Sequence, residues 1–473
     1  MLLLLHEIRH LVIVIGGYYP PREAAAVKES GSGPGRYLDD VPFGTDHLWI
    51  VVTLALVGLI EAYATGMTGV LVVVGQKFLN MSATDVPWLV VAPTFTLILG
   101  GLACGVYFQD RFSRRSILLV GVIWSCLFTL LTAFSGSTLQ LIAMRVISGF
   151  GYGLALPSAY PIGAELMPPK NRSTVGWTYE ASLGTGFTLV FLAATLLAHT
   201  ANGWRFIPLP ALILLVVLPI LIVKKIPESP RWLATRGHPQ AALAVVNRFR
   251  TRAGLTAVAA LPDVSATDRA VLPFSSLFKP GQFSRLMLAI SVYTCATVPF
   301  YVFSTLLPAI LVKQGFAEVA SFAFTIVLFA VTIPGKILNG WLMERLGRQV
   351  TIAGALFTSL VALGIGVLAP SATSFIIMEV LLGISVLSSY PAIRVYMTEQ
   401  FPTSNRGRGY FFSEMVGRFI AGVLVSFVLA YQLGSPGVIY AVVAAFAVVG
   451  ALSPLLFGKK DTRGSLERAA ADL

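Results

Sequence analysis

Long apolar stretches recur twelve times along the chain, separated by polar connectors. Each stretch is long enough to cross about 30 Å of hydrocarbon as an α-helix. The pattern therefore predicts an all-α membrane protein with twelve transmembrane helices. The predicted spans cover residues 48–74, 88–108, 117–134, 139–164, 174–198, 206–223, 286–312, 320–343, 350–368, 374–397, 410–431 and 438–457.

The composition supports a membrane protein. Hydrophobic residues make up 56% of the 473 positions and charged residues only 12%, whereas about 25% of residues are charged in a soluble domain. Cys104, Cys126 and Cys295 lie in apolar stretches and are too few for a disulfide framework. A secreted disulfide scaffold, a coiled coil and a disordered chain are excluded.

The basic residues are distributed unevenly over the connectors. With the C-terminal tail included, the connectors on one side carry 23 Lys and Arg residues and those on the other side carry 3. This asymmetry is the positive-inside signal, and it predicts that both termini and the long connector 224–285 are cytoplasmic. The net charge of +12 therefore reflects topology and does not indicate a nucleic-acid partner. We expect an integral protein of the bacterial inner membrane.

The first 47 residues contain apolar segments interrupted by Glu7, Arg9 and His10, so we do not expect a cleaved signal peptide. Residues 29–35 have the composition of a flexible linker. We predict a poorly ordered cytoplasmic tail over 1–47, with a helix on the membrane surface as the alternative.

The two halves of the chain repeat one another at a displacement of 234 residues. The basic connector 110–115 corresponds to 344–349, and Glu165, Pro168, Asn171 and Arg172 correspond to an identical set at 399, 402, 405 and 406. We infer a six-helix bundle at 48–223, a cytoplasmic connector at 224–285, a second six-helix bundle at 286–457 and a tail at 458–473. Such a parallel repeat is typical of a transporter with its binding site between the halves.

Several motifs resemble those of the major facilitator superfamily, on its side of sugar porters and organic-ion carriers such as aromatic-acid and nicotinate-type carriers. They are the two basic connectors, Arg145 followed by a Gly-x-Gly-x-Gly run at 149–153, Pro-Glu-Ser-Pro-Arg-Trp-Leu at 227–233, and the segment 399–407. The resemblance covers about residues 48–457. It implies transport by rocking of the two halves. The glycine run lies inside a span without an adjacent Lys-Ser/Thr, so we expect it to pack helices and not to bind phosphate.

Eight charged residues fall inside the predicted spans, and burying each in lipid costs roughly 2.5–3.5 kcal/mol. They must therefore face a cavity or one another. They are Glu61, Arg145, Glu180, Lys336, Glu379, Arg394, Glu414 and Arg418.

Glu61 and Arg145 share one depth, near the outer third of the membrane, at about 1.5 Å of rise per residue. Proton-coupled sugar porters resemble this, with an aspartate in span 1 and an arginine in span 4. Here Ala64 stands at the place of that aspartate. Glu61 lies three residues earlier on nearly the same helix face, so we predict that it pairs with Arg145 and carries the proton. A permanent structural ion pair is the alternative.

Lys336 and Arg418 lie at mid-depth, and their surroundings resemble span 8 and span 11 of organic-acid carriers. Two cations without an acid at that depth predict a site for a carboxylate. Glu414 precedes Arg418 by four residues and is well placed for a permanent pair, in which case Lys336 alone meets the anion. Glu414 is also a candidate for proton coupling.

The remaining charges and the aromatics have less specific patterns. We expect Glu180 to belong to the scaffold and Arg394 to join the cytoplasmic network, and we leave Glu379 unassigned. Tyr63, Tyr293, Tyr301 and Tyr390, with Trp177 and Phe300, could flank a planar substrate. Aromatic residues make up 11% of the chain, so packing is the first explanation for each of them taken singly.

Opposite charges at the cytoplasmic helix ends predict a latch that closes the inner mouth between the halves. Exposed pairs are worth about 0–1 kcal/mol each, so a latch must act as a network. Its members are Asp110, Arg114, Arg115, Glu165, Arg172, Glu228, Arg231, Glu344, Arg348, Glu399 and Arg406.

The sequence thus predicts a monomeric secondary transporter in the lipid bilayer that carries a small organic anion with protons. The anion would be a monocarboxylate, with aromatic acids included. A sugar or polyol carrier is the alternative within transport, and a membrane sensor that does not transport is the alternative outside it. The sequence has no metal-ligand cluster and no nucleophile beside a base, so we expect no enzyme, no cofactor and no metal.

Overall fold

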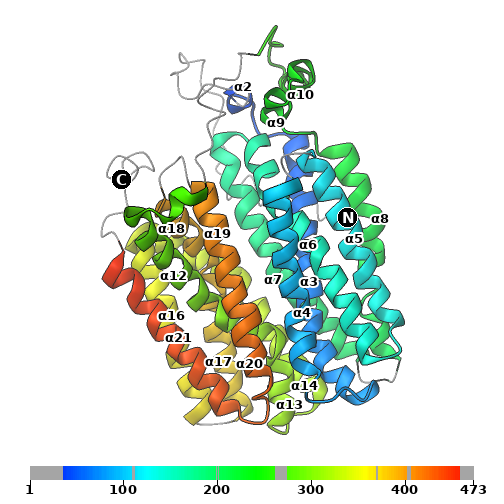
Figure 1. Ribbon diagram of the computed structural model, residues 1–473, viewed down its shortest axis with the longest axis vertical. Helices are drawn as coiled ribbons and strands as arrows, with labels where there is room; N and C mark the ends of the chain where they lie inside the picture. The colour runs from blue at the N-terminus through cyan, green and yellow to red at the C-terminus, as the bar shows by residue number, and fades with distance from the viewer. Residues whose placement is uncertain are drawn as a thin grey trace.

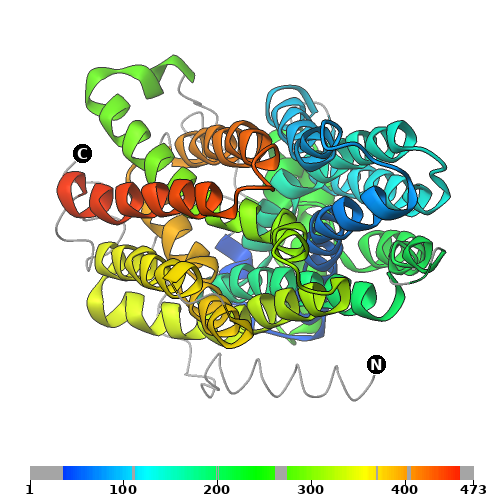
Figure 2. The same ribbon diagram turned by 90° about the horizontal axis from the view of Figure 1, so that it is seen from below.

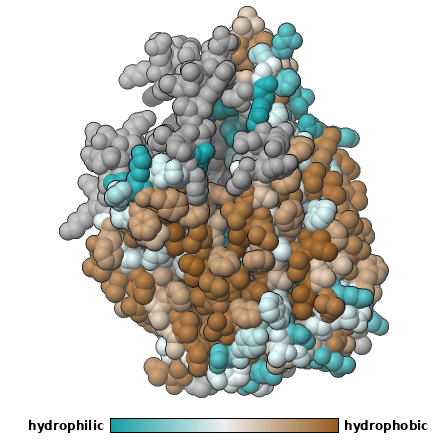
Figure 3. All heavy atoms as spheres, in the orientation of Figure 1, coloured by the Kyte–Doolittle hydropathy of each residue, from teal (hydrophilic) through white to brown (hydrophobic). Residues whose placement is uncertain are grey.

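The computed structural model describes residues 36–108, 112–198, 200, 202–261, 274–368, 371–401 and 406–458. All regular secondary structure in these ranges is helical. Twelve helices are long and apolar enough to cross a membrane, which confirms the predicted fold class. Figure 3 shows that hydrophobic residues cover the middle of the visible face, while hydrophilic residues gather toward its two ends.

The first half contains six long helices, and their ends lie within a few residues of the predicted spans. These helices are α3 (Thr45–Phe78), α4 (Val86–Ala103) with the π-helical turn η1 (Cys104–Phe108), α5 (Arg114–Leu131), α6 (Thr138–Leu166), α7 (Arg172–Leu197) and α8 (Pro210–Lys225).

The second half also has six spans, and four of them are interrupted or changed in pitch along their length. They are α12 (Pro280–Thr305) followed by α13 (Leu307–Lys313), α14 (Glu318–Ala330) with α15 (Thr332–Leu346), α16 (Arg348–Leu368), α17 (Ala372–Ile384) with α18 (Tyr390–Glu399), α19 (Arg406–Arg418) with η7 (Phe419–Val425) and α20 (Ser426–Ala430), and α21 (Pro436–Phe457). The two halves lie side by side in Figures 1 and 2.

Short helices mark one end of the molecule, which we call the connector end (Figure 1). They are α2 (Arg36–Asp39), α9 (Pro230–Thr235) and α10 (Pro239–Arg252). The opposite end, where α13 lies, is the far end.

The segment that leads into α3 packs against helix α10. Leu38 and Val41 are buried, Asp46 forms an ion pair with Arg252, and the His47 ring lies 5.1 Å from the ring of Phe249. The prediction of a poorly ordered tail is therefore wrong for residues 36–47, because their apolar side chains have a partner in the connector. Residues 1–35 lie outside the described ranges.

The halves approach each other closely at the far end. Lys77 at the end of α3 forms an ion pair of 2.9 Å with Glu318 at the start of α14. A Cβ added to Gly69 of α3 would lie 2.9 Å from the carbonyl oxygen of Ser304 in α12. The far end is thus closed by backbone packing and by an ion pair between the halves.

Close helix packing is also the role of the glycine run in α6, as predicted. The Cα atom of Gly149 lies over the carbonyl of Pro93 in α4, and that of Gly151 faces the Ser125 amide of α5, where an added Cβ would come within 2.7 Å of the amide nitrogen. Side chains at these positions would separate the three helices.

Candidate functional site

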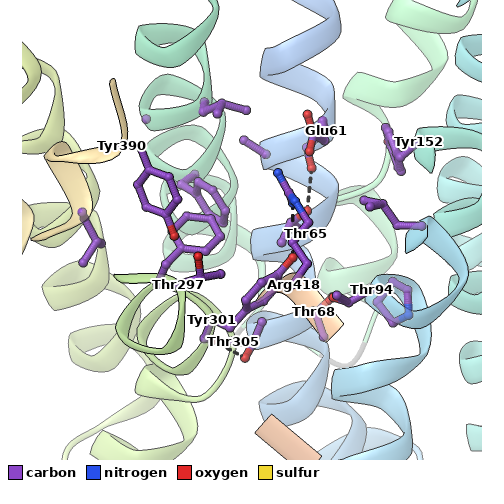
Figure 4. A pocket seen from close by; sticks show the side chains of 18 of the residues that line it. Glu61, Thr65, Thr68, Thr94, Tyr152, Thr297, Tyr301, Thr305, Tyr390 and Arg418 are labelled. Carbon is purple, nitrogen blue, oxygen red and sulfur yellow. Dashed lines mark hydrogen bonds between the residues drawn. The ribbon is translucent and has the colours of Figure 1, made fainter. Parts of the chain in front are cut away.

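A pocket lined by residues of both halves lies between them. Helices α3, α4, α6 and α7 line it from the first half, and α12, α14, α15, α18 and α19 line it from the second. In Figure 4, Tyr390 and Thr297 lie on one side of the pocket and Thr94 and Tyr152 on the other.

Glu180 of α7 connects the two halves through two ion pairs. Its Oε2 lies 3.3 Å from Lys336 Nζ of α15, and its Oε1 lies 2.8 Å from Arg394 Nη1 of α18. Lys336 also donates a hydrogen bond to the Glu180 carbonyl oxygen. Glu180 therefore links the two halves at the pocket, and the expectation that it belongs to the scaffold stays a prediction. Arg394 lines this pocket, and its ion pairs among the described residues are with Glu180 and Glu414.

Glu414 and Arg418 of α19 form the pair that their spacing allowed. Arg418 Nη2 and Nε lie 2.9 Å and 3.2 Å from Glu414 Oε1. Tyr293 donates a hydrogen bond of 3.1 Å to the same oxygen, and Arg418 donates one of 3.3 Å to the hydroxyl of Tyr301. Arg394 lies 3.9 Å away from Glu414.

The premise that Lys336 and Arg418 lack matching acids is consequently wrong. Each has a carboxylate within 4 Å, because α7 brings Glu180 to the level of Lys336 and one helical turn brings Glu414 to Arg418. We define the central cluster as three cations and three acids whose formal charges sum to zero when all are ionised. Its members are Glu61, Glu180, Lys336, Arg394, Glu414 and Arg418.

Glu61 has a different environment from the other two acids of the central cluster. Its Oε2 accepts a hydrogen bond of 2.7 Å from the Tyr179 hydroxyl, and within the described chain no cation lies within 4 Å of its carboxylate. In Figure 4 the Arg418 side chain lies between Glu61 and Tyr301. Glu61 is therefore the acid of the cluster that can gain a proton without breaking an ion pair.

The predicted pair of Glu61 with Arg145 is not formed. Arg145 Nη2 instead donates to the carbonyl oxygen of Ala64 at 2.6 Å and to Thr68 Oγ1 at 3.1 Å. Depth along two helices placed the side chains at one level, but it did not determine the directions in which they point. Arg145 is 1% exposed and lines the pocket.

The four tyrosines that were predicted to flank a substrate have different positions. Tyr293, Tyr301 and Tyr390 line the pocket. Tyr63 does not, because its hydroxyl donates a hydrogen bond of 2.6 Å to the Ile207 carbonyl within the first half. Its role is packing between α3 and the start of α8.

Three phenylalanines extend the aromatic lining formed by Tyr293, Tyr301 and Tyr390, and we call these six residues the aromatic wall. The Phe300 ring lies 5.5 Å from the rings of both Phe187 and Tyr390, and Phe187 stacks on Phe329 at 4.2 Å. The sequence had singled out only Phe300. Phe187 and Phe329 stand in spans already rich in apolar residues, where nothing separates a pocket residue from a lipid-facing one.

Six threonines also line the pocket, and sequence reasoning missed them. They are Thr65, Thr68, Thr94, Thr297, Thr305 and Thr332. Threonine is common in membrane spans because its hydroxyl bonds the preceding helical turn. Thr65 and Thr305 do this, so their types alone carry little signal.

The ion pairs at the connector end join residues within one half. Arg114 lies 2.5 Å from Glu165 in the first half, and Arg348 lies 2.8 Å from Glu399 in the second. These two pairs are equivalent under the displacement of 234 residues. In the part of the chain that the structure describes, they do not form the predicted latch between the halves.

The other latch candidates have mixed positions. The Glu228 carboxylate accepts a hydrogen bond of 3.3 Å from the Arg115 amide, again in the first half, and Arg231 and Glu344 are exposed. Asp110 and the side chains of Arg172 and Arg406 lie outside the described residues.

Comparison with known families agrees with this architecture. The sequence model of the Major Facilitator Superfamily matches residues 54–424. The chain belongs to this superfamily, whose members are transporters and not enzymes.

The names of individual relatives refer to different substrates. The chain is 26% identical over 402 residues to the niacin transporter NiaP of Acinetobacter baylyi, with 84% of this chain and 89% of the relative covered. It is 26% identical over 417 residues to a gallate transporter of Pseudomonas putida, covering 85% and 89%. It is also 26% identical over 399 residues to a D-xylose transporter of Levilactobacillus brevis, covering 79% and 83%.

Solved structures resemble the fold. The xylose transporter XylE from E. coli in a partially occluded inward-open conformation has a TM-score of 0.71 at 18% identity, with 89% of this chain and 100% of that chain covered. An inward-open form of XylE from E. coli has the same TM-score of 0.71 at 19% identity, covering 89% of this chain and 98% of that chain.

Proposed function

We propose that this protein is a proton-coupled symporter of small organic anions, with monocarboxylates, aromatic ones included, as its substrates. The observation that carries the proposal is the charge balance of the central cluster. Three cations face three carboxylates there, and Glu61 alone of these acids is held by a hydroxyl and not by a cation.

This charge balance couples binding of the proton to binding of the substrate anion. With Glu61 ionised the cluster is formally neutral, and with Glu61 protonated it carries one positive charge. A bound monocarboxylate restores neutrality. Because an unbalanced charge in a buried site is costly, the anion binds best to the protonated protein, and the proton stays best when the anion is bound.

The aromatic wall favours a substrate with a planar apolar part. Phe187, Phe300 and Tyr390 present ring edges and faces beside the central cluster. A ring between them buries apolar surface while its carboxylate reaches Arg418 or Lys336. Relatives named for niacin and gallate transport fit this class.

A sugar or polyol carrier is the second candidate. The hydroxyl-lined part of the pocket favours it, since sugars are recognised through hydrogen bonds. Relatives named as a D-xylose transporter and an arabinose-proton symporter also fit it. The central cluster has no evident role for a neutral substrate, which is why we place this candidate second.

In the proposed cycle the connector end faces the cytoplasm of a bacterial cell, and the protein works as a monomer. The substrate carboxylate competes with Glu180 for Lys336 and Arg394. Once displaced, Glu180 no longer links the halves, and they can rock apart at the connector end to release the anion and the proton.

Uptake into proteoliposomes with an alkaline interior tests the proposal. Labelled nicotinate, gallate and xylose are compared in the native protein and in Lys336→Gln and Arg418→Gln, with protein-free liposomes to correct for passive entry. Lys279→Gln removes an exposed charge and is the matched control. We expect one of the two acids to accumulate, and the two pocket variants to lose accumulation at least tenfold. Unchanged uptake in both variants contradicts the anion site.

A further inference from the structure

We propose that Arg145 forms a second anion subsite in the pocket, separate from the central cluster. The ligand is a small anionic group: either a free monovalent anion such as chloride, or the second carboxylate of a dicarboxylate whose first carboxylate binds the central cluster. This subsite stands on its own observations and does not require transport.

The guanidinium of Arg145 is buried with most of its donors unused. Of its five N–H groups, the two on Nη2 bond to the Ala64 carbonyl and to Thr68. Neither Nε nor Nη1 has a hydrogen-bond partner among the described residues. The residue is 1% exposed, so surrounding solvent does not replace those partners.

No described carboxylate forms an ion pair with Arg145. Leaving a buried cation without a counter-charge is strongly unfavourable, as is leaving buried donors unbonded. Arg145 is one of the residues that line the pocket, so an anion bound there lies beside this residue. An anion would balance its charge and accept from its free N–H groups.

The charge count of the whole pocket supports the same conclusion. The central cluster is neutral when its acids are ionised, and Arg145 adds one positive charge beyond it. Binding of a proton to Glu61 together with a substrate monocarboxylate adds no net charge, so the one excess positive charge remains. A second anionic group therefore has a place in the pocket in every state of the proposed cycle.

Melting temperatures of the purified protein test the subsite. Chloride replaces gluconate at constant ionic strength, and terephthalate is compared with benzoate, which has the same ring and one carboxylate fewer. A ligand that binds the folded state raises the melting temperature in a saturable way. The native protein, Arg145→Gln, Arg145→Lys and Arg418→Gln are measured in parallel.

A free-anion subsite predicts a chloride-dependent rise of a few degrees in the native protein and in Arg418→Gln, lost in Arg145→Gln and kept in Arg145→Lys. A dicarboxylate subsite predicts that terephthalate stabilises the native protein more than benzoate does, with the difference lost in Arg145→Gln. Absence of both effects in the native protein, or their persistence in Arg145→Gln, overturns the proposal.

The native protein provides a second measurement that does not depend on a variant folding. In crystals grown with bromide, anomalous density in contact with Nη1 or Nε of Arg145 supports the subsite. Bromide density confined to other positions, or none in the pocket, contradicts the free-anion form. If terephthalate also gives no advantage over benzoate, both forms fail. Failure of anion uptake would contradict the proposed function and leave this result unaffected.

Discussion

Lys336 and Glu180 lie in different halves of the molecule, and their charged groups meet 3.3 Å apart at the pocket. Glu180 also holds Arg394 at 2.8 Å. One acid of the first half thus binds two cations of the second. Because both contacts join the halves, they cannot survive a motion that separates α7 from α15 and α18.

Replacing Glu180 by Gln should raise anion affinity and slow the return of the empty carrier. The change leaves the central cluster with one positive charge when Glu61 is ionised and with two when Glu61 is protonated. It also removes the acid that binds Lys336 and Arg394 when no substrate is present. We expect exchange of labelled for unlabelled substrate to continue while net uptake falls at least tenfold. Equal losses of exchange and net uptake would point to a folding defect.

A double-mutant cycle measures the link between the halves. Glu180→Gln and Lys336→Gln should each lower the melting temperature, since removing one partner of a buried pair costs about 3–5 kcal/mol. The double variant should be more stable than the sum of the two losses implies, by about 0.5–3 kcal/mol. Additive losses would show that the contact contributes nothing to stability.

Glu61→Gln should remove proton-driven accumulation and keep exchange. The amide resembles the protonated acid in shape and charge, so the anion still binds, but no proton leaves with it. Uptake by this variant should no longer respond to an imposed pH gradient. Glu61→Asp serves as the control and should retain a response, since its carboxylate can still be protonated. A Glu61→Gln variant that accumulates substrate as the native protein does would exclude Glu61 as the proton carrier.

Gly69→Leu should favour the state in which the far end is open. Its side chain would meet the Ser304 carbonyl across the contact between the halves, and only separation of the helices relieves that clash. Spin-label distances between α3 and α12 at the far end should increase. Gly354→Leu is the matched control, because nothing lies within 4 Å of a Cβ at that helical position. Equal distances in both variants would contradict the assignment of the closed end.

Lys77→Gln should act in the same direction as Gly69→Leu but weakly. The ion pair with Glu318 is partly exposed, and such pairs contribute about 0–1 kcal/mol, so the population of the far-open state should rise by about fivefold at most. The effect should shrink in high salt. It is measured with the same spin labels. A larger shift that salt does not alter would mean that Lys77 acts through packing.

The helices and the repeat could be predicted because they depend on local patterns. Apolar length predicted all twelve spans, and the displacement of 234 residues anticipated that Arg114 with Glu165 and Arg348 with Glu399 occupy equivalent places. Spacing within a helix was also sufficient to predict the ion pair between Glu414 and Arg418, which lie one turn apart.

Contacts between different helices could not be predicted in the same way. Depth placed Glu61 near Arg145 and Arg394 near the helix end, but the rotation of each helix decides where its side chains point. Glu180 and Lys336 are 156 positions apart, and their meeting depends on how α7 packs against the second half. The sequence therefore identified the buried acids as residues that need partners, but it did not identify which residues those partners are.

Proton movement on addition of an anion tests the central claim most directly. A pH-sensitive dye inside proteoliposomes reports proton entry when nicotinate or gallate is added outside without a preset pH gradient, and labelled substrate reports anion entry in the same sample. We predict that the two enter together at a constant ratio, and that Glu61→Gln carries no protons in exchange. Anion uptake by the native protein without proton entry would contradict the account.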